Sequence, residues 1–116
     1  MQDFKNLKVW QRAHEFALRT YRITSDFPKD EVFGLRHLKR KFATDIPALI
    51  AEGCGKANDA EFSRAIRAAV ATAYRLEYYA LMAKDLEFIS PEIYDSYGTE
   101  LTEIKKMLNG FNRRLG

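Results

Sequence analysis

The sequence has only one cysteine, Cys54, so no disulfide can form within the chain. With three Pro and six Gly in 116 residues, it has no linker or low-complexity tract that would divide it. It contains no run of about 18 apolar residues that could span a bilayer, and its opening residues lack the features of a signal peptide. These absences predict a single cytoplasmic domain over residues 1–116, without a membrane partner, held together by its hydrophobic core.

Metal and nucleophile motifs are also missing. In a di-iron bundle a glutamate precedes each ligand histidine by three residues, whereas Gln11 precedes His14 and Gly34 precedes His37. We expect His14 to be a core residue on an apolar helix face and His37 to lie on the surface. Cys54 has no basic helper nearby in the sequence, which favours a small buried residue over a nucleophile. The sequence therefore predicts no metal ligand and no cofactor.

Two carboxylates near apolar faces, Glu52 and Glu77, remain as candidates for acid and base catalysis. Carboxylates in such positions more often pair with an arginine from a neighbouring helix, here Arg40 or Arg75. An enzyme would need a pocket in which both glutamates and a tyrosine converge. No phosphate loop and no hydrolase nucleophile elbow is present. We therefore predict that the protein is not an enzyme.

What the sequence does contain is helical periodicity in four segments. Apolar positions in the first segment recur at steps of three and four, which predicts a helix over residues 7–24. Its two rows are Leu7, Trp10, His14, Ala17 and Tyr21, and beside them Val9, Ala13, Phe16 and Thr20. Two adjacent rows make the broad buried face that a bundle helix needs. Residues 25–30, which include Pro28, are predicted to form the first loop.

A second helical face begins at Leu35 and ends near residues 53–55. Its apolar positions are Leu35, Leu38, Phe42, Ile46, Leu49 and Ile50. We expect a glycine of Gly53-Cys54-Gly55 to close this helix in the left-handed conformation. Pro47 lies inside the segment and predicts a kink over residues 43–47.

The third and fourth segments complete the fold. Asn58 or Asp59 caps the third, whose face is Phe62, Ile66, Ala69, Ala73, Leu76, Ala80 and Ala83. Ser90-Pro91-Glu92 opens the fourth, whose face is Ile93, Tyr97, Leu101, Ile104, Leu108, Phe111 and Leu115. Asn109-Gly110 predicts fraying or an early end of this last helix. Because the loops are short and no strand signal competes, the sequence predicts an all-α, antiparallel up-down-up-down four-helix bundle.

Charge is the feature that points to a partner. Lys and Arg number 19 against 16 Asp and Glu, a net charge of +3, and the cations occur in clusters. The candidate nucleic-acid-binding residues are Arg36, Lys39, Arg40 and Lys41 in the second helix, and Lys8, Arg12 and Arg19 in the first. Such clusters neutralise the phosphates of RNA or DNA regardless of base sequence, although a solvated helix face has a similar composition.

A second apolar stripe, Val70, Tyr74, Tyr78 and Leu81, runs along the third helix outside its core face. The core of one bundle does not cover both stripes. We therefore predict that these four residues form the interface of a homo-oligomer. An oligomer would repeat each basic cluster, so that several clusters could engage one partner with higher avidity.

With these motifs in place, the sequence resembles the small four-helix-bundle proteins known from intervening sequences inside bacterial 23S ribosomal RNA genes. The resemblance covers nearly the whole chain. It rests on an ordered set of matches: Phe4, Leu7 and Val9-Trp10-Gln11; Phe27-Pro28 and Phe33-Gly34-Leu35; Ile46-Pro47 and Ile50-Ala51-Glu52-Gly53; Glu61-Phe62 and Leu76-Glu77. The chain departs from the family pattern at Asp45 and Leu49, where the family usually has Ser and Asn, and at Ala71-Thr72 and Arg75.

The resemblance implies an up-down bundle assembled as a homopentamer, with no established enzymatic activity. At the level of fold it is also similar to the accessory proteins of diversity-generating retroelements, basic pentameric bundles that work with reverse transcriptase and nucleic acid. The function predicted is a non-catalytic oligomer that binds RNA or DNA through basic surface patches. The alternative is a structural or interaction protein that docks a protein partner, such as a nucleic-acid enzyme, without binding nucleic acid directly.

Overall fold

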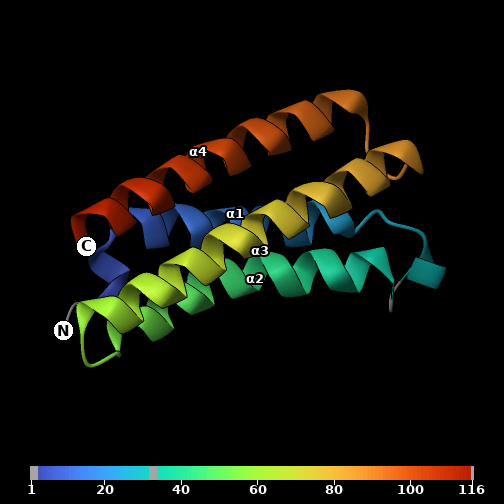
Figure 1. The fold of residues 1–116 in the computed structure, drawn as a ribbon. Helices are drawn as coiled ribbons and strands as arrows, with labels where there is room; N and C mark the ends of the chain where they lie inside the picture. Colours follow the sequence, from blue (N-terminus) through green and yellow to red (C-terminus); the bar gives the residue numbers. More distant parts are fainter. Residues whose placement is uncertain (1–2, 32–33, 116) are drawn as a thin grey trace.

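The computed structural model describes residues 3–31 and 34–115, and Phe33 of the family resemblance lies outside these ranges. Four α-helices, drawn in Figure 1, make up most of the described chain: α1 (Lys8–Thr24), α2 (Leu35–Cys54), α3 (Asp59–Asp85) and α4 (Pro91–Leu115). Short 3-10 turns, η1 (Phe4–Asn6) and η2 (Lys29–Glu31), precede α1 and α2. The described residues contain no strand, so the prediction of an all-α fold with four helices is confirmed for them.

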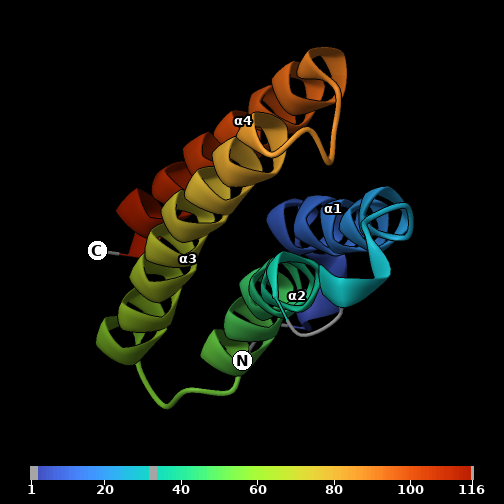
Figure 2. The ribbon, with the colours of Figure 1, turned by 90° about the vertical axis from the view of Figure 1, so that its right-hand side faces the viewer.

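The four helices form an elongated body of 43 × 23 × 20 Å. Each helix returns alongside the one before it, so both chain termini lie at one end, which we call the terminal end; the opposite end is the distal end (Figure 1). Figure 2 shows two helix pairs, α1 with α2 and α3 with α4. Helix α2 also packs closely on α3, whereas α1 and α4 touch much less and, within the described residues, the backbones of α1 and α3 do not come close to each other.

Helix α3 has the core register that its sequence predicts. All seven residues of the predicted face are buried, and the four alanines among them allow neighbouring helices to approach closely. The Asn58 side chain caps the helix by accepting a hydrogen bond from the Glu61 backbone N–H at 2.9 Å. This helix is therefore the centre of the bundle, in contact with both α2 and α4.

Helix α4 begins as predicted, with Ser90 Oγ accepting a hydrogen bond from the Ile93 backbone N–H at 3.1 Å and with Pro91 as the first helical residue. Ile93 is 38% exposed, because it lies in this first turn at the distal end. The helix continues through Asn109-Gly110 to Leu115, so the expectation of an early end was wrong. Phe111, in the turn after Gly110, is buried against Phe62 of α3, and this contact stabilises the end of α4.

Helix α1 buries only one of its two predicted rows. The row of Val9, Ala13, Phe16 and Thr20 is buried, together with Ala17. In the other row Trp10 is half-buried, Tyr21 is 45% exposed, and His14 is exposed and stacks on Trp10 with ring centroids 4.9 Å apart. The expectation that His14 is a core residue was therefore wrong. One row suffices because α1 packs on α2 and only lightly on α4.

Helix α2 is continuous across Pro47, whose side chain is buried, and the kink stays a prediction. Its buried positions are Leu35, Lys39, Ala43, Ile46, Pro47, Ile50, Gly53 and Cys54. Leu38, Phe42 and Leu49 are half-buried on its flank. The helix ends at Cys54, and Gly55 has a φ of −89°, so the left-handed closure expected from the sequence was wrong. None of the described helices is long and apolar enough to cross a membrane.

Candidate functional site

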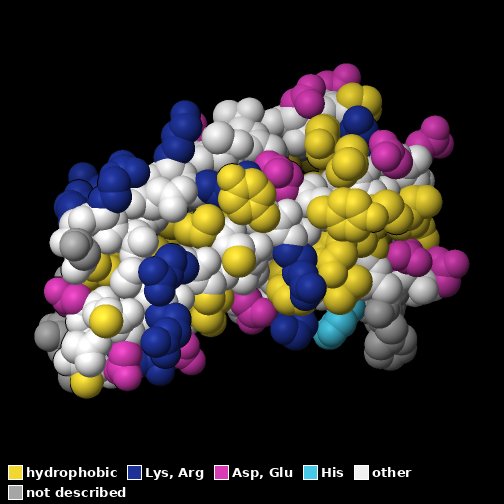
Figure 3. All heavy atoms as spheres, in the orientation of Figure 1, with side chains coloured by type: hydrophobic (Ala, Val, Ile, Leu, Met, Phe, Trp, Pro, Cys, Tyr) yellow, Lys and Arg dark blue, Asp and Glu magenta, His cyan; other side chains and the backbone are white. Residues whose placement is uncertain are grey.

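Charged side chains are unevenly distributed along the bundle. On the face that Figure 3 shows, most Asp and Glu side chains lie toward the distal end, whereas Lys and Arg dominate the half near the termini. The sequence causes this polarity, because the two distal loops are rich in acids such as Asp30, Glu31 and Glu87, while α4 ends with Arg113 and Arg114. The terminal end is therefore the more attractive surface for an anion.

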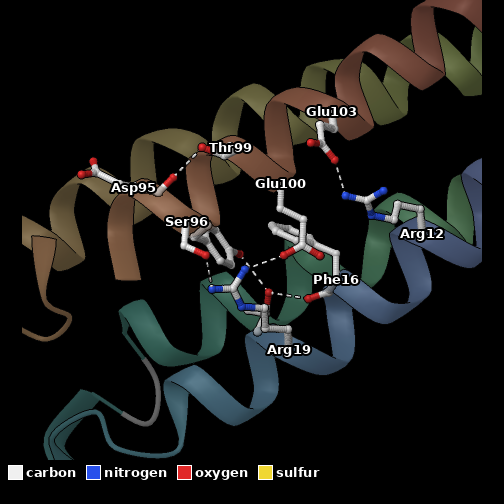
Figure 4. Close-up of polar contacts among 10 residues, drawn as sticks. Arg12, Phe16, Arg19, Asp95, Ser96, Thr99, Glu100 and Glu103 are labelled. Atoms are coloured by element: carbon white, nitrogen blue, oxygen red, sulfur yellow. Dashed lines mark hydrogen bonds and ion pairs between the residues drawn. The ribbon is translucent and has the colours of Figure 1, made fainter. Parts of the chain in front are cut away.

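Arg12 and Arg19, predicted to contact phosphates, reach from α1 to α4 instead (Figure 4). Arg12 forms an ion pair with Glu103. Arg19 forms one with Glu100 at 2.5 Å and also donates to Ser96 Oγ at 2.9 Å. These pairs bridge the seam between the two helices, and each guanidinium already faces a carboxylate. A phosphate would have to compete with that carboxylate for either arginine.

Lys39 is not on the surface at all. Its side chain is fully buried, its Nζ lies 4.1 Å from the centroid of the Tyr97 ring, and no polar atom of the described residues is within hydrogen-bonding distance of it. Burial lowers the pKa of Lys39 from 10.5 to about 7. The prediction that Lys39 binds nucleic acid was therefore wrong, because this position belongs to the core row of α2.

The neighbouring cations of α2 are also engaged within the chain. Arg40 donates to Thr24 Oγ1 at 2.7 Å and to the Tyr21 carbonyl at 3.1 Å, which ties α2 to the end of α1. Lys41 pairs with Asp45 one turn later at 3.2 Å. Arg36 is half-buried and forms no ion pair with any described residue. Of the predicted α2 cluster, only Arg36 thus keeps an accessible cation without a described internal partner.

Cations without an ion pair in the described chain occur along the whole bundle, among them Arg22, Lys29, Arg36, Arg67 and Arg75, but seven of them lie toward the terminal end. We define this set as the terminal cations: Lys5, Lys8, Lys56, Arg64, Lys106, Arg113 and Arg114. Lys8 and Arg114 line the same groove of about 390 Å³, between the start of α1 and the end of α4. Ser63 donates to Asn112 Oδ1 at 2.5 Å and so holds the start of α3, with Arg64, beside the end of α4. Of this set, Lys8 is one of the seven candidate binding residues, and the basic clusters that the sequence shows on the first helix and near the C-terminus also include Lys5, Lys106, Arg113 and Arg114.

The predicted interface residues of α3 lie on its outer side. Tyr74 is 59% exposed and Tyr78 is 57% exposed, while Val70 and Leu81 are half-buried. Lys105 Nζ sits 4.0 Å from the centroid of the Tyr74 ring and pairs with Glu77 at 2.9 Å. These contacts of Lys105 support the exposed Tyr74 ring on the outer side of α3. The stripe is an exposed apolar face without a partner in the described chain.

The two glutamates considered for catalysis lie in different grooves. Glu77 lines a groove of about 540 Å³ between α3 and α4 together with Tyr94 and Tyr97. Glu52 lies beside Lys56 and Arg64 between α2 and α3. Glu77 pairs with Lys105, not with Arg75 as its sequence position suggested. The arrangement does not bring Glu52, Glu77 and a tyrosine together.

Cys54 is buried, and burial raises the pKa of its thiol. This environment favours the uncharged thiol and not the thiolate that a nucleophile needs. Within residues 3–31 and 34–115, no group of three or more His, Cys, Asp or Glu side chains is placed to hold a metal ion.

A buried polar contact across the bundle was not expected from the sequence. Thr20 Oγ1 donates to the Phe16 carbonyl at 3.0 Å, which leaves the Tyr97 hydroxyl to donate to Thr20 Oγ1 at 2.9 Å. Burial raises the pKa of Tyr97 well above its ordinary value. The signal was present, because Thr20 and Tyr97 both occupy predicted core rows and each polar atom there needs a partner.

Three comparisons with known proteins bear on this arrangement. The family model described as 23S rRNA-intervening sequence protein matches residues 5–110. Among solved structures, the chain is similar to a protein of unknown function from the S23 ribosomal protein family from Bacteroides thetaiotaomicron VPI-5482. That likeness has a TM-score of 0.84 and 25% sequence identity, and it covers 90% of this chain and 95% of the other. No curated protein matches the chain.

Proposed function

The chain belongs to the 23S rRNA-intervening sequence protein family, and we propose that it is a non-catalytic oligomer that binds RNA or DNA through the terminal cations. The observation that carries the proposal is the set of seven terminal cations without an ion pair in the described chain, which lie on η1, α1, the connection between α2 and α3, α3 and α4. Cations that form no ion pair within the chain can replace the counterions of a phosphate backbone. The descriptions of the family and of the similar structure both refer to the ribosome or its RNA.

The assembly is part of this proposal. The exposed stripe of Val70, Tyr74, Tyr78 and Leu81 supports contact with another copy, since Tyr is enriched at protein interfaces. The family resemblance implies five copies in an up-down bundle arrangement. Each added copy would bring another set of terminal cations to the same nucleic acid, which raises avidity without any new contact.

A non-catalytic role in the cytoplasm fits the remaining side chains. The separation of Glu52 from Glu77 removes the acid and base pair that catalysis would require. The single thiol, at Cys54, is free and buried, which suits a reducing compartment.

We expect reversal of three terminal cations to weaken binding of a ribosomal RNA fragment. In Lys8→Glu/Arg113→Glu/Arg114→Glu, three exposed cations become carboxylates without loss of a described ion pair. Affinity should fall at least tenfold at moderate salt, and the slope of log affinity against log salt should become shallower by about 2. Fluorescence anisotropy over a salt series measures both quantities.

A control reverses two cations of the distal end. Lys29→Glu/Lys84→Glu changes the net charge by −4, against −6 in the triple variant, and also removes the ion pair of Lys84 with Asp85. Both positions lie outside the terminal cations, so the affinity should stay close to that of the parent protein. A loss of log affinity about two thirds of that in the triple variant would show an effect of net charge alone and would contradict the assigned site. If the parent protein binds no RNA or DNA at low salt but retains a protein partner after nuclease treatment, the protein-docking alternative replaces the proposal.

A further inference from the structure

Helix α1 carries an exposed row that the core does not use. Steps of four and three along α1 and its two cap residues define the α1 stripe: Leu7, Gln11, His14, Leu18, Tyr21 and Ser25. Leu18 is 46% exposed and Tyr21 is 45% exposed, and His14 is exposed above Trp10. Large apolar side chains thus lie in solvent on the side of α1 that faces away from the bundle.

Helix α3 carries a row with the same steps. We call it the α3 stripe: Arg67, Ala71, Tyr74, Tyr78, Leu81 and Asp85. Every residue of the α3 stripe stands 60 positions after its counterpart in the α1 stripe, so the two rows have equal length and phase. At 1.5 Å of rise per residue each row is about 27 Å long. Rows of this period form the seam of a helix pair.

The two stripes cannot cover each other within one chain. Helices α1 and α3 lie across the bundle from each other, and their backbones do not come close among the described residues. Both run from the terminal end toward the distal end (Figure 1). Copies related by rotation about an axis along the bundle would therefore place α1 of one copy parallel to α3 of the next.

We propose that the α1 stripe of one copy packs on the α3 stripe of the next copy in a head-to-tail contact. The proposal rests on the proposed oligomeric function and adds the surface that the α3 stripe contacts in the neighbouring copy. In register, His14 meets Tyr74, Leu18 meets Tyr78, and Tyr21 meets Leu81. The two surfaces differ, so each copy offers one to each neighbour. Such a contact closes into a ring when the rotation between copies divides a full turn.

Charge complementarity supports this register. In a parallel coiled coil, the residue that follows a d position faces the partner residue that precedes the a position before it. The steps of three and four make Tyr21 and Tyr74 d positions. That rule places the exposed Arg22 beside Glu77 of the neighbouring copy, whose side chain is 42% exposed while it pairs with Lys105 of its own chain. It also places the exposed Arg75, whose guanidinium lies 5.0 Å from the centroid of the Phe42 ring in its own chain, near Trp10 of the neighbouring copy. No pair of like charges meets along the seam.

A two-fold symmetric contact between copies would bury different residues. Two α3 stripes could meet antiparallel, with Arg67 against Asp85 and Tyr74 against Tyr78. That contact would leave the α1 stripe in solvent and would produce pairs instead of rings. The exposed apolar residues of α1 therefore favour the head-to-tail contact, which covers both stripes.

Cysteine cross-linking separates these arrangements. Leu18→Cys and Tyr78→Cys place one exposed thiol on each stripe, and the native Cys54 is buried. Each variant oxidised alone should give no cross-linked species, whereas the mixture after subunit exchange should give covalent dimers. The double variant should give a ladder on a non-reducing gel whose largest member equals the number of copies in the ring.

Ile93→Cys on α4 is the matched control, because its thiol is exposed outside both stripes and should cross-link with neither variant. Dimers from Tyr78→Cys alone would overturn the proposal in favour of the antiparallel contact. An oligomer by native mass that shows no cross-link in the mixture would overturn the proposal and leave the proposed oligomeric function standing. A monomer by native mass at high concentration would overturn both.

Discussion

Replacement of Lys39 by methionine is expected to raise the free energy of unfolding at pH 7 by about 3 kcal/mol. The amine is fully buried, no described polar atom bonds to it, and its pKa is about 7 instead of 10.5. A difference of this size corresponds to roughly 4 to 5 kcal/mol of penalty on the charged amine. The methionine removes that penalty together with the cation–π contact to Tyr97, which offsets about 1 to 2 kcal/mol of it.

The gain depends on pH in a direction that the pKa of Lys39 fixes. Between pH 7 and pH 10.5 the unfolded chain holds a proton on this amine that the folded chain does not, so the stability of the parent protein rises with pH. Below pH 7 both states are protonated and the full penalty applies. The advantage of Lys39→Met should therefore be largest at or below pH 7 and shrink by up to about 1.4 kcal/mol per pH unit above it.

Urea unfolding of both proteins from pH 6 to pH 9 measures this difference directly. The control is Lys41→Met, which removes an exposed lysine two positions away and an ion pair with Asp45, and should change stability by less than about 1 kcal/mol. A Lys39→Met protein that is less stable than the parent, or whose advantage does not vary with pH, would show that the amine is not buried and neutral.

The register of α2 shows how far the sequence could be interpreted. Its hydrophobic residues fall on two flanks, and grouping all of them into one face placed Leu38 and Phe42 in the core and left Lys39 outside. The observed core row keeps one side of that face and includes the lysine. A row through Leu35, Ala43, Ile46 and Ile50 passes through position 39, so the buried lysine could have been found from spacing alone. Hydrophobicity outweighed periodicity in the prediction.

The buried face of helix α3 was predicted correctly because hydrophobicity and helical periodicity select the same residues. Small and large apolar residues follow one strict period over the whole helix, and every residue of the predicted face is buried. The same agreement set the exposed Tyr74 and Tyr78 apart from the core. On α1, by contrast, two apolar rows compete, and the sequence alone does not say how many neighbours the helix has.

The cations could be counted from the sequence, but their partners could not. Arg12 and Arg19 find Glu103 and Glu100, which are more than 80 positions away in the chain. Pairing over such separations depends on which helices become neighbours and how they are rotated. A basic cluster in sequence therefore overstates the free positive surface, and here only Lys8 and Arg36 of the seven predicted residues lack a described internal partner and remain accessible.

Substitution of alanine for two glycines should change stability in opposite directions. Gly53 belongs to the Ile50-Ala51-Glu52-Gly53 motif and lies where α2 crosses α3. A Cβ at this position would lie 2.7 Å from Cδ1 of Phe62 and 3.2 Å from the Ala65 Cβ. Phe62 cannot move away freely, because it is buried against Phe111 with ring centroids 5.3 Å apart. We expect Gly53→Ala to lower the free energy of unfolding by about 1 to 3 kcal/mol.

Gly98 lies in the interior of α4, and a Cβ added there would meet no described atom within 4 Å. Gly98→Ala therefore gains only the helix preference of alanine and should stabilise by about 1 kcal/mol. Chemical denaturation measures the free energy of unfolding of both variants. Because the substitution is the same, the difference between them separates the effect of close packing at Gly53 from the helix preference of alanine at Gly98. Combining Gly53→Ala with Phe62→Leu should recover part of the loss, because the smaller side chain leaves room for the methyl group. Stabilisation by Gly53→Ala, or no recovery in the double variant, would show that this glycine is retained for a reason other than the approach of α3.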